Sequence, residues 1–310
     1  MQALLDAIAT AALPTDAQRI FHGRGGLYPG CEAWTLDAYP PVWLVTKFGA
    51  VTPEEQALLT AALQARHDQL APDRPLNAVL QTRHEGRSDT TVLAGSLPEP
   101  HAVSEDGAQY RVNLQRGQNH GLFLDMAEGR RWVRAHARGH KVLNLFAYTC
   151  AFSVAALQGG AKEVVNLDMA QGALTTGQQN HQINGITSGA KFLAHDLFSS
   201  WGKVTRMGPY GLVIMDPPSF QRGSFVATKD YARLLRRLPD LLRPGGHALL
   251  CLNAPEIPER FLHELLATEA PELALLERLP NPAAFADVSS DRALKVLLVR
   301  LPPLPERPTA

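Results

Sequence analysis

This 310-residue sequence has few cysteines, no long apolar run and a formal net charge of zero. Its three cysteines, Cys31, Cys150 and Cys251, are odd in number and far apart, so they suit neither a disulfide framework nor a zinc motif. No run of about eighteen apolar residues occurs, which predicts the absence of a transmembrane helix. The first residues include Asp6 and lack the basic start of a secretory signal. We therefore expect a cytoplasmic protein with no membrane contact and no metal.

Charge is balanced overall but unevenly distributed. Residues 1–110 carry a net charge of −6 and residues 111–310 a net charge of +6. The densest basic cluster contains Arg130, Arg131, Arg134, Arg138 and Lys141. On a helix these side chains could contact phosphates, or they could form an ordinary solvated face. A neutral chain gives only weak support for nucleic-acid binding, because phosphate contacts normally supply much of that affinity.

Residues 142–168 read as half of a nucleotide-binding α/β unit. A short apolar run, 142–146, predicts a buried parallel strand. A loop of small and polar residues and a helix at 152–157 follow, and Gly159-Gly160 ends that helix. A second strand at 163–167 precedes Asp168. An acid about twenty residues after the first turn is placed to accept hydrogen bonds from ribose hydroxyls.

The alternation of strands and helices continues to about residue 301. Further strands are predicted at 191–194, 211–215, 247–252, 272–279 and 293–301. This pattern predicts an α/β fold with a doubly wound, Rossmann-like sheet of about seven strands, the last one antiparallel. A helix at 229–242 should be kinked or shortened by Pro239.

A small α+β domain is predicted to precede this sheet. Residues 1–100 form the accessory domain, 101–125 a β-hairpin connector that turns at Asp106-Gly107, and 126–310 the catalytic domain. Within the accessory domain we expect strands at 33–37, 42–48, 78–83 and near 91–93, with a helix from Thr52 to about Leu70. Residues 19–29 are glycine-rich and predict a turn region. Arg19, His22 or Arg24 in that loop could alternatively contact RNA.

Polar residues follow the predicted parallel strands. The strand-tip positions are the segment 144–149, which contains Asn144 and Thr149, together with Asp168, Asp196, Asp216 and Asn253. Each acid alone is typical of a helix cap or a turn. Several of them at the carboxyl edge of one sheet favour a ligand site, because ligands of open α/β sheets bind there.

Three of these segments resemble the motifs of class I S-adenosylmethionine-dependent methyltransferases. They are Asn144–Thr149 (NLFAYT), Asp168 and Asp216–Phe220 (DPPSF). More narrowly, they are similar to the large-subunit ribosomal RNA methyltransferases of the I and K/L types, as is Gly121–Asp125 (GLFLD). The resemblance covers about residues 108–302 and, more weakly, 17–95. It implies S-adenosyl-L-methionine as cofactor, large-subunit rRNA as partner and no metal. The oligomeric state is open, a homodimer included.

The resemblance also implies roles for individual residues. Asp168 would hold the ribose, Asp196 the adenine amino group, and Leu197 or Phe198 the adenine ring. The cofactor-binding residues would be Asp125, Asn144, Phe146, Ala147, Tyr148, Thr149, Asp168, Met169, Asp196, Leu197 and Asp216.

The catalytic residues would be Asp216, Pro217, Pro218, Phe220 and Asn253. Two prolines fix the backbone so that a carbonyl can point at an acceptor amine, and an aromatic ring can stack on an extruded base.

This sequence departs from the family pattern in two places. Cys150 and Ala151 stand where a glycine is usual, which puts the cofactor affinity in question. Asn253 stands at the strand tip where carbon-5 methyltransferases have a cysteine, and Cys251 is expected in the core. A nitrogen target is therefore favoured over carbon 5. Basic residues near the site, Lys229, Arg292 and Lys295, could contact phosphates, but surface charge is favoured for the last two.

Two alternatives stay open at this point. One is a methyltransferase of the same fold that acts on a protein or a small molecule, which the neutral charge favours. The other is a non-catalytic RNA-binding relative, which the missing glycine favours. A dehydrogenase is disfavoured because the first loop has no Gly-x-Gly-x-x-Gly cradle for a pyrophosphate.

Overall fold

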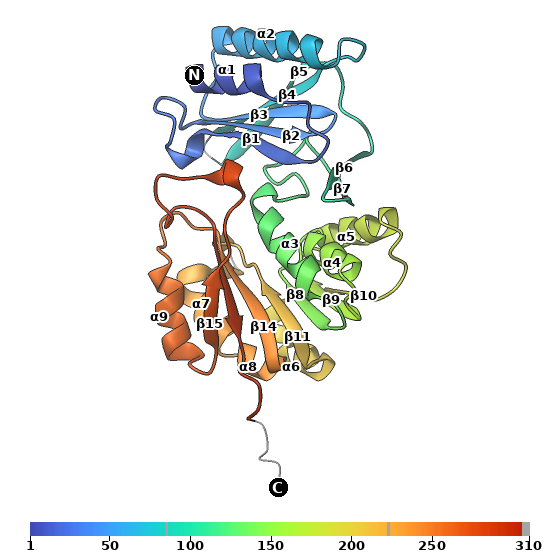
Figure 1. Ribbon diagram of the computed structural model, residues 1–310, viewed down its shortest axis with the longest axis vertical. Helices are drawn as coiled ribbons and strands as arrows, with labels where there is room; N and C mark the ends of the chain where they lie inside the picture. Colours follow the sequence, from blue (N-terminus) through green and yellow to red (C-terminus); the bar gives the residue numbers. More distant parts are fainter. Residues whose placement is uncertain (85, 222–223, 306–310) are drawn as a thin grey trace. The chain divides into compact units, whose positions relative to one another are not determined.

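The computed structural model describes residues 1–84, 86–221 and 224–305, and the chain divides into two compact units (Figure 1). The first unit comprises Met1–Ala127 and Pro282–Ser290. The second comprises Glu128–Asn281 and the chain from Asp291 onward. The predicted connector hairpin, β6 (His101–Glu105) and β7 (Ala108–Val112), falls in the first unit. The predicted catalytic domain extended to residue 310, and residues 306–310 lie outside the described chain.

The first unit is built on a five-stranded sheet with the strands in chain order. These are β1 (Gln18–His22), β2 (Trp34–Tyr39), β3 (Val42–Phe48), β4 (Asn77–His84) and β5 (Arg87–Ala94). Only β3 and β4 run parallel, and the crossover between them is α2 (Pro53–Leu70). Thr52 caps the start of α2, as its sequence predicts, and the structure adds a reciprocal bond with Glu55 that completes a capping box. Helix α1 (Gln2–Thr10) packs beside α2 (Figure 1).

Strand β1 corrects one expectation. We expected a glycine-rich turn from Arg19, but the chain is extended through His22, and the 3₁₀ helix η1 (Gly23–Gly25) begins only after it. The reason is long-range pairing. Arg19 lies opposite Asp37 on β2, and its guanidinium bonds both carboxylate oxygens, at 2.6 and 3.1 Å. Local composition gave no sign of that partner.

The second unit contains the seven-stranded sheet that the sequence predicts, in the order β10-β9-β8-β11-β14-β16-β15. The strands are β8 (Lys141–Leu145), β9 (Glu163–Asp168), β10 (Ala190–Ala194), β11 (Tyr210–Met215), β14 (Leu242–Leu252), β15 (Ala274–Arg278) and β16 (Lys295–Arg300). Strand β16 is antiparallel to both of its neighbours. The expectation of an antiparallel last strand is therefore confirmed.

Helices cover both faces of this sheet (Figure 1). One group consists of α3 (Ala127–His136), α4 (Ala151–Gln158) and α5 (Gln171–Ile183). The other consists of α6 (Leu197–Met207), α7 (Ala227–Leu235), α8 (Leu238–Leu241) and α9 (Arg260–Glu269). The predicted helix at 229–242 is divided into α7 and α8, with Pro239 in the first turn of α8, where the missing N–H costs nothing.

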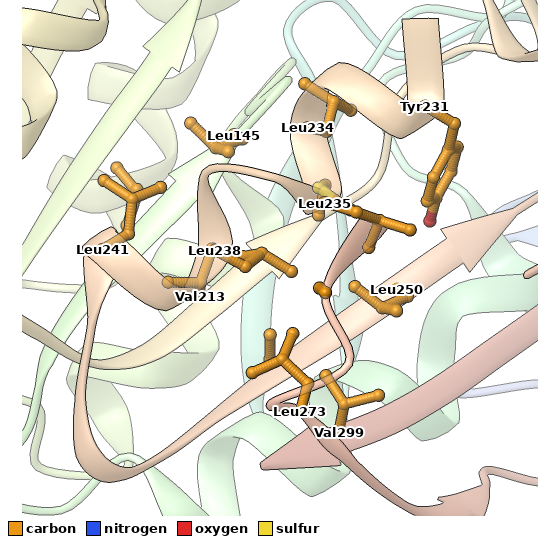
Figure 2. Close-up of a cluster of buried hydrophobic side chains, with 14 of the residues drawn as sticks. Leu145, Val213, Tyr231, Leu234, Leu235, Leu238, Leu241, Leu250, Leu273 and Val299 are labelled. Carbon is orange, nitrogen blue, oxygen red and sulfur yellow. The ribbon is translucent and has the colours of Figure 1, made fainter. Parts of the chain in front are cut away.

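The largest apolar core lies between the sheet and the α6–α9 group (Figure 2). Leu145, Val213 and Leu250 contribute from adjacent strands, and all three are fully buried. Tyr231 on α7 is also fully buried, and its hydroxyl donates to the carbonyl oxygen of Cys251 at 3.0 Å. Cys251 itself is inaccessible to solvent, which confirms the prediction of a core cysteine. This core holds the strand ends in a fixed frame.

Candidate active site

The polar residues that follow the parallel strands meet at one edge of the second unit's sheet. Asp168 ends β9, Asp216 follows β11 and Asn253 follows β14. Asp196 follows the edge strand β10. Because these strands are parallel neighbours, their carboxyl ends lie side by side. The structure therefore brings these predicted site residues to a single edge.

The loop after β8 has an unusual backbone. Phe146, Tyr148 and Cys150 all have positive φ angles, of 55°, 47° and 61°. Left-handed backbone is rare for residues other than glycine and costs roughly 1–3 kcal/mol at each position. The loop is held by bonds to its neighbours: the Ala147 N–H donates to the carbonyl of Leu167 at 3.0 Å. Such a constrained loop at a strand tip is typical of a ligand site.

Asp168 joins this loop to β9. Its Oδ2 accepts from the backbone N–H of Tyr148 at 2.7 Å, and its Oδ1 accepts from the N–H of Ala170 at 2.8 Å. A carboxylate has about four lone-pair sites, so each oxygen can accept one further bond. The residue is half-buried, and Met169 beside it is 53% exposed. The carboxylate is thus oriented by the backbone while still able to accept hydroxyl groups.

A buried polar chain supports the loop from below. The Asn144 amide donates to Asn166 at 2.9 Å, and the Asn166 amide donates to Ser153 at 3.0 Å. The Ser153 hydroxyl contacts Nε2 of His181 at 2.9 Å, and the His181 Nδ1 lies 2.7 Å from the carbonyl of Gly177. Nδ1 must donate to that carbonyl, so Nε2 accepts the Ser153 proton. Burial lowers the pKa of His181, which keeps the ring neutral.

This hydrogen-bond network includes one predicted site residue, Asn144. Asn144 was expected to contact the cofactor, but its side chain is 2% exposed and bonded to the adjacent strand. It therefore supports the loop from within the sheet. Polar residues inside otherwise apolar predicted strands are the signal that could have revealed this network.

Cys150 is accommodated at the position where a glycine is usual. Its side chain is fully buried with Ala147, Leu174 and Phe192. Burial raises the pKa of the Cys150 thiol, so it is a poor nucleophile. A Cβ atom added at Gly177 would lie 2.5 Å from the Cys150 sulfur. The missing glycine in the loop is thus matched by a glycine on α5.

The end of β10 leads directly into α6. Asp196 is the N-cap of α6, and its Oδ1 accepts from the Phe198 N–H at 3.0 Å. Leu197 is 2% exposed and belongs to the core, whereas Phe198 is half-buried. We expected Leu197 or Phe198 to contact an adenine ring, and of these two residues only Phe198 has an accessible side chain.

An aromatic group that sequence reasoning missed lies beside Phe198. The ring of Phe198 is stacked with that of Phe225 at a centroid distance of 6.4 Å. The centroid of the Phe225 ring lies 5.4 Å from that of Phe146. The guanidinium of Arg233 lies 3.8 Å from the centre of the Phe198 ring. Phe225 precedes the predicted helix at 229–242 and Arg233 lies within it, so no pattern marked either residue.

The Asp216-Pro217-Pro218 segment leaves β11 and leads to a short hairpin of β12 (Phe220–Gln221) and β13 (Phe225–Val226). Pro217 is buried, and Asp216 and Pro218 are half-buried. Phe220 is 67% exposed, which leaves a large aromatic face open to solvent. Asn253 is also exposed, one residue beyond β14.

Lys295 corrects another expectation. We favoured surface charge for this residue, but it is fully buried. Its Nζ donates to the carbonyl oxygens of Ala254 and Asp291, at 2.8 and 2.5 Å. Burial lowers the pKa of Lys295, and the nearby Arg278 lowers it further. Lys295 therefore holds the residue that follows Asn253. Lys229, in contrast, is exposed, and its contact with phosphates stays a prediction.

Asp125 is described in the first unit, in the 3₁₀ helix η2 (Leu124–Met126), so its contact with the cofactor stays a prediction. Among residues 1–84, 86–221 and 224–305, no group of three or more His, Cys, Asp or Glu side chains is placed to hold a metal ion. Within the same ranges, no helix combines the length and apolar character needed to cross a membrane.

The fold and the strand-tip site define a class of protein. A family model described as S-adenosylmethionine-dependent methyltransferase matches residues 18–300. The chain belongs to this family, and S-adenosyl-L-methionine is the family's cofactor.

The names of individual relatives are more specific than the family description. The chain is 29% identical over 247 residues to ribosomal RNA large subunit methyltransferase I of Aeromonas salmonicida, covering 78% of this chain and 62% of that protein. It is 30% identical to the protein of the same name from Erwinia tasmaniensis, covering 89% of this chain and 71% of the relative. It is 38% identical to methyltransferase K/L of a Psychrobacter species, over 55% of this chain and 22% of the relative.

A solved structure, described as a candidate methyltransferase complexed with SAH, is also similar. It has a TM-score of 0.80 and 25% identity, and the match covers 96% of this chain and 78% of that one.

The residues of this chain fit S-adenosyl-L-methionine. Asp168 retains acceptor capacity for two ribose hydroxyls, as its geometry above indicates. The bulk of Cys150 is directed into the protein against α5, so it does not fill the strand edge. This nucleoside carries no pyrophosphate, so the absence of a glycine-rich phosphate cradle is expected.

Proposed function

We propose that this protein transfers a methyl group from S-adenosyl-L-methionine to a nitrogen atom of a base in large-subunit ribosomal RNA. The observation that supports this most directly is the Asp216-Pro217-Pro218 segment at the same sheet edge as Asp168. The segment ends in an aromatic residue, Phe220, whose side chain is exposed and free to stack on a base.

The chemistry requires mainly positioning. When bound, the cofactor supplies an electrophilic methyl group. The carbonyl oxygens of Asp216 and Pro217 can accept hydrogen bonds from an acceptor amine, and the two prolines restrict their orientation. Asn253 at the neighbouring strand tip can bond a base edge. Holding the base in line with the methyl group is worth several orders of magnitude in rate.

A nitrogen target is supported by the cysteines. Methylation at carbon 5 of a pyrimidine requires a thiolate that attacks the ring. All three cysteines of this chain are buried, and the strand tip carries Asn253 instead. The same three free thiols support a location in the reducing cytoplasm.

The decisive experiment compares base modifications in large-subunit rRNA. Nucleosides from a deletion strain and from the wild type are separated and identified by mass spectrometry. We expect one methylated base to be absent in the deletion strain and restored by the wild-type gene, but not by a Pro218→Ala or Phe220→Ala variant. A Leu276→Ala variant is the matched control, because Leu276 is also exposed and apolar, at 48%.

Two outcomes would point elsewhere. An unchanged rRNA profile, with cofactor binding intact by calorimetry, would favour a protein or small-molecule substrate. Failure to bind the cofactor below about millimolar concentration would favour a non-catalytic RNA-binding relative.

A further inference from the structure

The second unit carries a group of basic side chains at the end of its sheet opposite to the strand tips. We call it the basic end cluster, and its members are His136, His140, Arg243, His247 and Arg300. They come from α3, from the residue before β8, from the first half of β14 and from the last residue of β16. Because β16 is antiparallel, its final residue lies at the amino ends of the parallel strands. The cluster is therefore separate from the candidate active site.

The side chains of the cluster are close together. Arg243 Nη2 lies 3.1 Å from His140 Nδ1. His247 and Arg300 lie directly opposite each other on β14 and β16. Trp132 on α3 links the remaining members, since its ring stacks on His136 at 4.2 Å and meets His247 edge-on at 6.0 Å.

No carboxylate neutralises the two arginines in the described parts of the chain, because neither Arg243 nor Arg300 forms an ion pair there. The Nε of Arg300 is buried and has no hydrogen-bond partner among those residues. Some other cations of the unit are paired: Lys141 contacts Glu163 at 2.9 Å, and Arg278 contacts Glu259 at 2.5 Å. An anionic ligand would supply the negatively charged partner that the guanidinium groups of Arg243 and Arg300 lack.

The electrostatics of the histidines agree with this geometry. Burial lowers the pKa of His247, and the neighbouring guanidinium groups of Arg300 and Arg243 lower it further. Burial also lowers the pKa of His140, with Arg243 and Lys162 acting in the same direction. The region therefore has a positive potential that attracts anions.

We propose that the basic end cluster binds a phosphodiester group of the RNA backbone. Guanidinium groups bind phosphate oxygens through two parallel hydrogen bonds, and an accessible tryptophan beside them can stack on a base. Trp132 is half-buried, so part of its side chain is accessible to solvent. A small carboxylate ligand would not use that ring.

The inference rests on the proposed function, because it gives the substrate RNA a second contact. Strand β8 has five residues and β11 six, so the cluster and the active-site edge are roughly 17–20 Å apart. A substrate that reaches both must be a folded RNA segment and not an isolated nucleotide. The cluster would add affinity without touching the reacting atoms.

The test compares RNA binding with catalysis. An Arg243→Gln/Arg300→Gln variant and the wild type are titrated with protein-free large-subunit rRNA from the deletion strain, at several salt concentrations. We expect the affinity of the variant to fall about tenfold and the slope of log affinity against log salt to decrease by about 1–2. Cofactor affinity, and the methylation rate at saturating RNA, should change less than twofold.

An Arg206→Gln/Arg237→Gln variant is the matched control, because it removes the same charge from exposed positions on α6 and beside α8. If the double substitution destabilises the fold, the single variant Arg243→Gln is used in its place, because Arg243 is exposed. RNA affinity and salt slope that match the control variant would overturn the inference, even with rRNA methylation intact. Binding of inorganic phosphate that is lost in the Arg243→Gln/Arg300→Gln variant, with no change in RNA affinity, would overturn the inference too. If the wild-type protein binds the rRNA but does not methylate it, the proposed function is contradicted, and the inference about RNA binding is judged separately from the affinities.

Discussion

The Asp168 carboxylate and the backbone N–H of Tyr148 form a hydrogen bond of 2.7 Å that joins the ends of two adjacent strands. This bond has two consequences. It fixes a left-handed residue in the loop after β8, where φ is 47°. It also orients the carboxylate so that the remaining lone pairs of its oxygens are directed away from the loop amide. The acid expected to hold the ribose thus also shapes the loop expected to hold the rest of the cofactor.

The first prediction concerns this acid. Asp168→Asn should weaken the binding of S-adenosyl-L-methionine by about 10–100-fold, because a charge-assisted hydrogen bond contributes about 1.5–3 kcal/mol. Calorimetric titration measures the effect, with Asp240→Asn as a control for the loss of an exposed carboxylate, 63% accessible on its side chain. The asparagine NH₂ group would also face a backbone N–H, and two donors cannot bond each other. Because this could destabilise the fold, a thermal melt accompanies the titration. An affinity equal to that of the control would remove Asp168 from the cofactor site.

The second prediction concerns the pair Cys150 and Gly177. A Cβ at Gly177 would lie 2.5 Å from the Cys150 sulfur and 3.0 Å from its Cβ. Gly177→Ala should therefore reduce the free energy of unfolding by about 1–3 kcal/mol, the usual cost of overpacking. In a Cys150→Gly background the same substitution should be neutral or stabilising, because alanine is the better helix former by about 1 kcal/mol. Chemical denaturation of the four proteins gives the coupling energy. Equal effects of Gly177→Ala in both backgrounds would contradict the idea that α5 makes room for the loop cysteine.

Most of the second unit could be predicted from the sequence because several of its strands are short apolar runs that are followed by Asp, Asn or Pro. The division at Pro239 follows from the same local chemistry. The strand-tip acids were predictable because parallel strands place their carboxyl ends at one edge. What local patterns could not reveal were partners distant in the chain. Arg19 belongs to a strand because Asp37 pairs with it, and Cys150 fits because Gly177 lies opposite.

Lys295 shows the same limit within the site. A lysine at the start of a strand reads as surface charge, and nothing near it in sequence indicates otherwise. Its burial follows from the antiparallel pairing of β16 with β14, which places Lys295 opposite Leu252. Ala254, whose carbonyl Lys295 bonds, is 41 residues away in the chain. Phe225 and Arg233 were missed for a similar reason, since their aromatic partners come from other strand tips.

The third prediction assigns Lys295 a positioning role. Lys295→Met keeps the length of the side chain but leaves the carbonyl oxygens of Ala254 and Asp291 without their donor. The loop that presents Asn253 should lose its fixed position. We expect kcat for rRNA methylation to fall about tenfold, an effect of about 1.4 kcal/mol, with the Kd of the cofactor unchanged. A merely structural role would instead reduce the melting temperature and lower kcat only in proportion to the unfolded fraction.

The fourth prediction concerns acid stability. Burial lowers the pKa of several histidines in the folded state, His181 among them, and lowers that of His22 to about 4. The unfolded chain, with histidine pKa values near 6.5, then binds more protons than the native protein. The free energy of unfolding should therefore stay level above pH 7 and decrease as the pH falls from about 6.5 towards 4. Paired carboxylates such as Glu163 and Glu259 have a lowered pKa and contribute losses only below about 4.5.

A matched pair of variants isolates the contribution of His181. His181→Gln removes the titrating ring, so the slope of unfolding free energy against pH between 4.5 and 6 should decrease by up to about 1.4 kcal/mol per pH unit. Ser153→Ala removes the hydroxyl that bonds Nε2 but keeps the ring. It should lower stability at pH 8 by about 1 kcal/mol and retain the wild-type slope. Urea denaturation at four pH values measures both quantities. A His181→Gln slope equal to that of the wild type would mean that the buried ring already takes up its proton in the native state, which contradicts the neutral hydrogen-bond chain from Asn144 to Gly177.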